Sequence, residues 1–231
     1  MSVTSLVFSP FSRSFPSVAL AAALGVALGV APAAMAANDN SDVSVRGNIR
    51  PSACRIALSE NGEVDYGTIS ATVVSKSTAG YSPGQREVVL TIHCELETRV
   101  GVAVRDNRVG TRADITGIDL YGFGLGKFNE FKLGAYTITP GATAATEKGE
   151  VALLISDDKG RNWARNSLRT LRADGVSMLS WAEPGSTTPA ARRQFQTPLR
   201  VDAYLPKADA LPKLDQTIEL DGSATLSLVY L

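Results

Sequence analysis

Residues 88–104 read VVLTIHCELETRVGVAV, and this stretch carries the pattern that decides the fold. Apolar side chains stand at every second position on both sides of a polar break at 95–99. Such alternation is typical of strands that bury one face. The stretch therefore predicts two strands, which we expect to be neighbours in one sheet. The alternating residues are Val88, Leu90, Ile92, Val100, Val102 and Val104.

The same alternation recurs along most of the chain, between turn signals rich in Gly, Pro, Asn and Asp. A single segment, 162–173, has apolar and arginine spacing that fits a surface helix or a solvated loop. Many short strands with few helix signals predict an all-β antiparallel sandwich. The further strands that we expect are 43–50, which ends at Pro51, then 64–69, 131–138, 151–155, 195–205 and 217–230.

The N-terminus has the features of an export signal. The apolar run 18–31 has 14 residues, which is shorter than the roughly 20 that a bilayer span needs. Pro32 follows it, and Ala34-Met35-Ala36 supplies the small-x-small pattern that a signal peptidase recognises. We therefore expect residues 1–36 to be a signal peptide, with a membrane anchor or a buried helix as the alternative.

Export determines what the two cysteines mean. Cys54 and Cys94 both remain in the mature chain and would enter an oxidising compartment, where disulfides form and persist. One disulfide is the expected state, and two free thiols are the alternative. A redox-active pair is disfavoured because the chain has no Cys-x-x-Cys.

Charge and composition exclude several classes of function. Lys and Arg number 23, as do Asp and Glu, so the chain offers no field that would attract nucleic acid. His93 is the only histidine, which excludes sites that need two imidazoles, and two cysteines cannot form an all-cysteine zinc site. We expect His93 to point away from the buried face of its strand.

Two further motifs fail when their spacing is checked. The glycine-rich segment 122–128 suggests a phosphate loop, but Tyr121 and Phe128 stand where glycine and the metal-binding hydroxyl are required. We expect a strand edge or a long turn there instead. Asp157 and Asp158 lack the other ligands of a calcium loop and predict a hairpin tip. The sequence therefore predicts no catalytic residue, no metal ligand and no cofactor.

Both ends of the mature chain resemble fimbrial subunits (pilins) of the chaperone–usher pathway. Near the N-terminus, 45–54 reads VRGNIRPSAC, with Gly47 seven positions before the first cysteine, and 65–69 reads DYGTI. The second cysteine then ends an apolar strand. At the C-terminus, 222–231 reads GSATLSLVYL, with alternating apolar residues and a penultimate tyrosine.

The resemblance implies an immunoglobulin-like (pilin-type) sandwich, residues 51–231, that lacks its last strand. In this family, the open groove accepts a strand from a periplasmic pilus chaperone and then the N-terminal extension of a neighbouring fimbrial subunit, as an outer-membrane usher assembles the fibre. The extension here would be 37–50. The resemblance implies that the donor side chains are Val43, Val45 and Ile49, and that Leu226, Leu228 and Tyr230 line the groove and contact the chaperone.

We therefore expect a structural or minor fimbrial subunit without catalysis, which passes through the periplasm to the cell surface. Gly222 lies nearer the C-terminus than the corresponding glycine of pilins, so the register of the last strand stays open. The alternative function is a secreted adhesin or carbohydrate-binding module that contacts a glycan or host surface through 105–195. A periplasmic hydrolase is the third hypothesis. Alternation at both termini also fits the first and last strands of a complete sandwich.

Overall fold

The computed structural model describes residues 43–48, 53–165 and 170–231. The chain divides into two units, 1–48 and 49–231, and the larger one contains all the regular secondary structure of the described residues. Its regular secondary structure is almost entirely antiparallel strand, so the predicted all-β class is confirmed. Within the described ranges, helix is limited to α1 (Ala71–Ser75) and the 3-10 turns η1 (Ser59–Gly62) and η2 (Ala208–Ala210), and none of these could cross a membrane.

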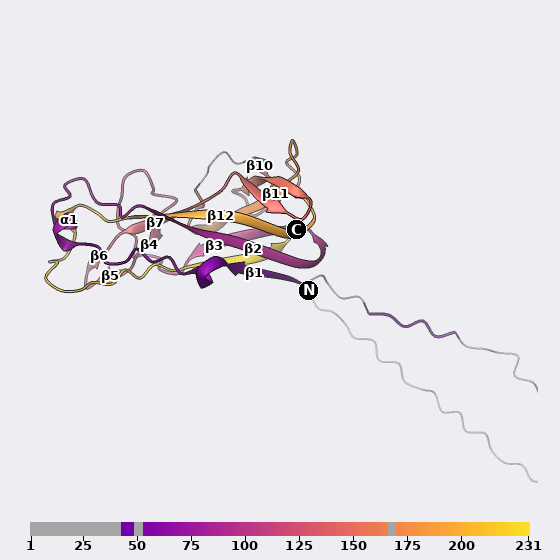
Figure 1. Cartoon of the computed structure of the whole chain (residues 1–231), viewed down its shortest axis with the longest axis horizontal. Coiled ribbons are helices and arrows are strands. Elements are labelled where there is room, and N and C mark those ends of the chain that lie inside the picture. The colour runs from indigo at the N-terminus through magenta and orange to yellow at the C-terminus, as the bar shows by residue number, and fades with distance from the viewer. Residues whose placement is uncertain (1–42, 49–52, 166–169) are drawn as a thin grey trace, which may run out of the picture. The chain divides into compact units, whose positions relative to one another are not determined.

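Two long strands, β2 (Gln85–Thr98) and β12 (Arg192–Tyr204), pair with each other and run along most of the larger unit (Figure 1). Helix α1 and the strands β4 to β7 lie toward one end, and β10 and β11 lie toward the other. The remaining strands in the described residues are β1 (Cys54–Leu58), β3 (Val100–Asp106), β4 (Phe123–Gly124), β5 (Lys127–Phe128), β6 (Phe131–Lys132), β7 (Ala135–Pro140), β8 (Thr143–Thr146), β9 (Gly149–Ser156), β10 (Ala164–Arg165), β11 (Asp174–Ala182) and β13 (Ala224–Tyr230).

One antiparallel sheet contains every strand except the β5–β6 hairpin. Its order is β1-β2-β12-β8-β9-β11-β3-β13, with β7 also paired to β12, β4 to β7 and β10 to β9. The sheet curls so that its two edges meet at one point. There the Cys54 N–H on β1 donates a hydrogen bond to the Tyr230 hydroxyl on β13, with N and O 3.0 Å apart. The curled sheet thus surrounds one core and leaves a seam between β1 and β13.

The core contains the alternating residues predicted in 88–104, together with residues from strands that the alternation did not predict. Its largest side chain, Trp181 on β11, stacks on Phe195 of β12 with ring centroids 4.6 Å apart, and both are fully buried. The indole N–H of Trp181 donates to Thr197 Oγ1 at 2.8 Å, so its polar atom is satisfied within the core. Phe123 and Tyr136 form a second stacked pair, with centroids 5.2 Å apart.

The expected disulfide is confirmed. Cys54 and Cys94 are bonded, and they stand directly opposite each other in the register of β1 and β2. The bond therefore ties the edge strand β1 to the long strand β2.

The expectation that 88–93 and 100–104 form neighbouring strands was wrong. Strand β2 pairs with β1 and β12, whereas β3 pairs with β11 and β13. A single residue, Arg99, joins β2 to β3, which is shorter than the two-residue loop of the tightest hairpin. The chain therefore passes into the other half of the sheet instead of turning back.

Strand predictions elsewhere had mixed outcomes. The strands expected at 151–155 and 195–205 are present as β9 and β12. The segment 131–138 is divided into β6 and β7 at Gly134, where a Cβ would lie 2.4 Å from the Tyr204 carbonyl oxygen. Residues 43–48 form no strand and are exposed, and 64–69 and 217–223 form none either. Alternation alone does not make a strand, because a strand also needs a partner edge.

Segment 162–173, for which a surface helix and a solvated loop were the two interpretations, has no helix in its described part. Ala164 and Arg165 form β10, which pairs with β9, and residues 170–173 are irregular. Leu171 is buried in the core instead of lying on a surface helix. A neighbouring strand edge has overridden the weak local pattern.

The two motifs that failed as ligand sites have structural roles. Within 122–128, the Gly124 N–H donates to the buried Asp106 carboxylate, and a Cβ at Gly124 would lie 2.1 Å from Thr111 Oγ1. Asp158 lies at the tip of the β9–β10 hairpin, as predicted. Hydrogen bonds from Ser156 and Asn162 lower the pKa of its carboxyl to about 2.

Candidate functional site

The two edges of the sheet leave apolar side chains incompletely covered. Within the described residues, β1 pairs only with β2, and β13 pairs only with β3. Half-buried positions alternate with exposed ones along β1 and along β13 as far as Leu228. The half-buried apolar side chains that pack on the core from β1, from β13 and from the segments next to them are Ile56, Leu58, Val64, Tyr66, Ile69, Leu214, Leu220, Ala224, Leu226 and Leu228.

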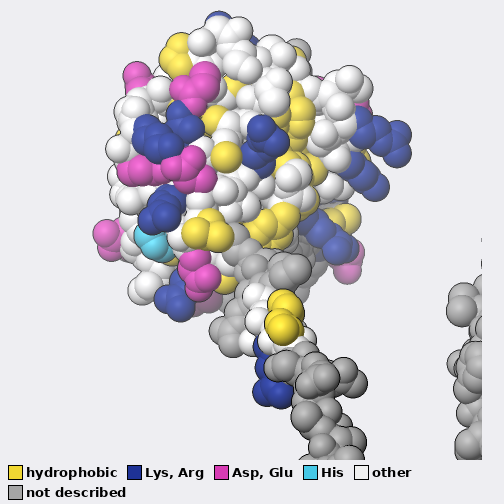
Figure 2. Space-filling model, turned by 90° about the vertical axis from the view of Figure 1, so that its right-hand side faces the viewer, with side chains coloured by type: hydrophobic (Ala, Val, Ile, Leu, Met, Phe, Trp, Pro, Cys, Tyr) yellow, Lys and Arg dark blue, Asp and Glu magenta, His cyan; other side chains and the backbone are white. Residues whose placement is uncertain are grey.

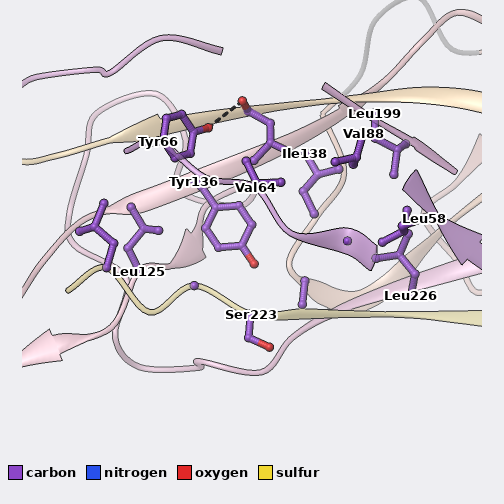
Figure 3. Close-up of a pocket in the computed structure, with 15 residues that line it drawn as sticks. Leu58, Val64, Tyr66, Val88, Leu125, Tyr136, Ile138, Leu199, Ser223 and Leu226 are labelled. Atoms are coloured by element: carbon purple, nitrogen blue, oxygen red, sulfur yellow. Dashed lines mark hydrogen bonds between the residues drawn. The ribbon is translucent and has the colours of Figure 1, made fainter. Parts of the chain in front are cut away.

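A cavity of about 270 Å³ lies in this seam. Leu58 and Leu226 lie at one end of it, Leu125 lies at the other, and the Tyr136 ring stands between them (Figure 3). The floor is formed by inward-facing side chains of β2, β7 and β12: Val88, Ile138, Leu199 and Val201. The cavity opens to the surface, and its lining combines these apolar side chains with polar atoms.

A second, larger cavity of about 980 Å³ continues from the first. The two share Val64, Tyr66 and Leu220 in their walls, so we treat them together as the seam groove. The walls of the second cavity come mainly from 63–69 and 214–220, and neither segment belongs to a strand. The seam groove is therefore flanked by two strand edges along one part and by two unpaired segments along the other.

Tyr66 holds one of these unpaired segments in place. Its hydroxyl donates to the Val201 carbonyl oxygen at 2.8 Å, which is the dashed contact in Figure 3. The Arg86 guanidinium lies 5.1 Å from the centroid of its ring. Burial raises the pKa of Tyr66 to about 12, so the phenol stays protonated and able to donate.

The opposite wall is held by an ion pair and by a glycine. Arg108 Nη2 lies 2.6 Å from Asp221 Oδ1, and the Asp221 N–H donates to the Leu125 carbonyl oxygen. Gly222 follows, and a Cβ there would lie 2.9 Å from the Tyr136 ring. Only glycine allows the backbone to approach Tyr136 this closely without a shift of the ring.

Tyr230 closes the other end of the seam. Its side chain is 54% exposed, yet its hydroxyl accepts the hydrogen bond from the Cys54 N–H across the gap. Neither residue lines the cavities. The seam groove is thus open beside Leu226 and bridged beside Tyr230.

The bridge gives a first prediction. Tyr230→Phe removes the only atom of the side chain that bonds to Cys54, and we expect the free energy of unfolding to fall by about 0.5–1 kcal/mol. The Cys54 amide should exchange its hydrogen faster in the variant, as measured by NMR or mass spectrometry. Tyr121→Phe, outside the groove, is the control. Unchanged exchange at Cys54 would contradict the bridge.

The charged residues that line the second cavity are all acidic. They are Glu63 and Asp65 on one wall and Asp215 and Glu219 on the other, and all four are exposed. Elsewhere the surface is mixed: on the face in Figure 2, basic and acidic side chains are interspersed. These four carboxylates share the rim with the Arg86 guanidinium, which lies over Tyr66 and donates to the Asp65 carbonyl oxygen.

The structure brings only part of the predicted site together. Leu226 lines the seam groove, Leu228 packs on the core just beyond it, and Tyr230 bridges its end. Val43 and Val45 are 88% and 92% exposed, and Ile49 lies outside the described residues, as does the expected signal peptide 1–36.

Sequence reasoning missed the walls at 63–69 and 214–220 as parts of the site. The signal was an apolar residue at every second position: Val64 and Tyr66 in one wall, Ile218 and Leu220 in the other. This pattern predicted ordinary strands. His93 is exposed, as expected. No group of three or more potential metal ligands occurs in the described ranges.

Three comparisons with known proteins bear on the chain. Residues 43–122 match the family model described as "Protein of unknown function (DUF1120)". Protein GltF of Escherichia coli K12 is 31% identical over 259 aligned positions, which cover 96% of this chain and 99% of GltF. The uncharacterized protein YhcF of the same organism is 29% identical over 226 positions, which cover 84% of this chain and 92% of YhcF.

Proposed function

This chain belongs to the family of Protein GltF, and we propose that it is a structural or minor subunit of a bacterial surface fimbria, assembled by donor-strand exchange. The observation that carries the proposal is the seam groove, which has apolar side chains on its floor and lies between two strand edges that have no partner in the described part of the chain. In this proposal the curled sheet is an immunoglobulin-like sandwich from which one strand is absent.

The free edges support strand addition because of their physical properties. An exposed strand edge presents unpaired N–H and C=O groups, which another extended chain can pair with. Here both edges flank one apolar floor, so an added strand could bond to β1 and β13 while its side chains fill the cavity. A closed sheet would offer neither feature.

The N-terminal extension supports the complementary role of donor. Val43 and Val45 are almost fully exposed in a segment without regular structure. Burying both side chains in a groove would remove their apolar surface from water, which favours binding. In this proposal the chain is exported to the periplasm, and its partners are a periplasmic chaperone and an outer-membrane usher. The proposal includes no catalytic centre.

Thermal unfolding with a peptide tests the proposal. We expect a synthetic peptide of residues 37–50 to raise the midpoint of the purified, oxidised chain that starts at Ala37. A ligand of the native state at 100 times its Kd adds about 2.7 kcal/mol, which corresponds to a rise of about 5–10 °C for a domain of this size.

The matched control is the same peptide with Val43→Asp and Val45→Asp, which should leave the midpoint unchanged because charged side chains cannot enter an apolar groove without a large desolvation cost. If the protein is stable alone and neither peptide shifts the midpoint, then the fimbrial proposal fails. A self-contained binding module then becomes the better account.

A further inference from the structure

We propose that the cavity beside Tyr136 binds a small, uncharged and largely apolar molecule, one that carries a carbonyl or ether oxygen as acceptor for the Tyr136 hydroxyl. This inference goes beyond the proposed function, because the cavity and the hydroxyl define the site and no added strand is required. It follows from a hydrogen-bond donor without a partner, from the lack of charged side chains around it and from the size of the cavity.

The Tyr136 side chain carries a buried polar group without a partner. The residue is 7% exposed, it lies on β7, and its ring stacks on Phe123. Figure 3 shows the ring among the lining side chains, with its hydroxyl pointing into the cavity. Within the described residues, no group forms a hydrogen bond with this hydroxyl. Buried polar side chains nearly always have a partner, so the hydroxyl marks a place for an acceptor from outside the chain.

The other polar side chains that line the cavity already have partners. The Tyr66 hydroxyl donates to the Val201 carbonyl oxygen, and Ser223 Oγ accepts a hydrogen bond from Asn107 Nδ2 at 3.0 Å. No charged side chain is among the described residues that line this cavity. An ion would lose its water without gaining an opposite charge, at a large cost in free energy. The ligand is therefore uncharged.

The Tyr136 phenol stays protonated and can donate. Burial raises its pKa and the nearby Asp106 carboxylate raises it further, whereas Arg108 lowers it. The Asp106 carboxylate is bonded elsewhere: its two oxygens accept the N–H groups of Arg108 and Gly124, at 2.8 and 3.0 Å. The chain thus holds a donor in the cavity and keeps its nearest anion engaged with the backbone.

The volume of the cavity suits one ring with a short substituent. Its volume of about 270 Å³ is just below the range of about 300–1,000 Å³ that is typical of small-molecule sites. An apolar cavity of about 150 Å³ is sufficient to bind benzene. The walls near the Tyr136 hydroxyl are mainly aliphatic and include Leu125, Ile138 and Leu226. A benzene ring with a short ketone group therefore has the size, the polarity and the single acceptor that the site requires.

Two probes of nearly equal shape separate the hydrogen bond from apolar burial. Acetophenone carries a ketone oxygen, and α-methylstyrene carries a CH₂ group in its place. Their Kd values are measured by NMR titration of the purified, oxidised protein and of its Tyr136→Phe variant. The quantity compared is the Kd of α-methylstyrene divided by the Kd of acetophenone. The difference in apolarity between the probes is the same for both proteins, so it cancels when the two ratios are compared.

We expect this ratio to be about tenfold higher for the unaltered protein than for Tyr136→Phe. In each mismatched pair, the tyrosine with α-methylstyrene or the phenylalanine with acetophenone, one buried polar group is left without a partner. Ala224→Leu enlarges a half-buried side chain in the wall of the cavity. It should weaken the binding of both probes, because it takes up space that they need.

Tyr66→Phe is the matched control, because it removes a hydroxyl that lines the same cavity but already has a partner. It should keep the ratio of the unaltered protein. It should also lower the thermal midpoint of the free protein by about 2–4 °C, since it breaks an internal hydrogen bond. Tyr136→Phe should leave that midpoint within about 1 °C, because no internal hydrogen bond is lost.

Three results would overturn the inference. The first is an equal ratio for the unaltered protein and for Tyr136→Phe. The second is a fall in the midpoint of Tyr136→Phe as large as that of Tyr66→Phe, because the hydroxyl would then bond within the protein. The third is that neither probe binds, or that both bind Ala224→Leu as tightly as the unaltered protein. None of these results decides the proposed function, which the peptide of residues 37–50 tests separately.

Discussion

Replacing both cysteines, as Cys54→Ala with Cys94→Ala, is expected to lower the free energy of unfolding by about 4 kcal/mol. The bond closes a chain segment with a sequence separation of 40, and the loss of that closure increases the entropy of the unfolded chain by about this amount. For a domain of this size the thermal midpoint should fall by about 8–16 °C. Urea unfolding at neutral pH, monitored by tryptophan fluorescence, measures the change.

Reduction supplies the control for this prediction. The unaltered protein in excess dithiothreitol should unfold at nearly the midpoint of the double variant, and the double variant should not respond to dithiothreitol. A double variant within about 1 kcal/mol of the unaltered protein would show that the register of β1 and β2 holds without the bond. The disulfide would then contribute nothing to the seam.

The position of the disulfide gives it a second effect. Strand β1 has five residues and one partner strand, so few hydrogen bonds hold it to the sheet. Cys54 ties the start of that strand to Cys94, which is buried in the middle of β2. The bond therefore stabilises the edge that the proposed donor would pair with, and reduction should weaken peptide binding as well as stability.

Much of this fold could be predicted from local pattern. Alternation in 88–104 identified the positions of β2 and β3 that face the core, and the expected export together with two cysteines predicted the disulfide. Pattern could not give the partners of each strand. The order of β2 and β3 depends on the length of the link at Arg99 and on packing across the core, neither of which alternation records.

The candidate site was only partly predictable for a related reason. Leu226 was identified because it lies in the C-terminal segment that resembles pilins, and it does line the seam groove. Val64 and Tyr66 alternate in the same way, but they lie on a segment without a strand partner. A sequence shows which residues are suited to a sheet, whereas the absence of a partner is a property of the whole fold.

Replacing the groove residue Leu226 by aspartate should abolish the stabilisation by the 37–50 peptide while leaving the free protein folded. Leu226 is half-buried on an edge strand, so the carboxylate keeps access to water in the free protein. An added strand would bury that carboxylate against the apolar floor, which costs far more than the lost leucine contact. We expect binding to weaken at least about 100-fold, and the rise in the thermal midpoint to disappear.

Two companion variants show whether this effect belongs to the groove. Leu226→Ala removes apolar contact without adding charge, and it should weaken binding by about tenfold. Val109→Asp places the same charge on an exposed loop residue outside the seam groove, and it should leave the peptide effect intact. If the peptide still raises the thermal midpoint of the Leu226→Asp variant by the full amount, then the peptide binds elsewhere. In that case the end of the cavity beside Leu226 is not part of the acceptor.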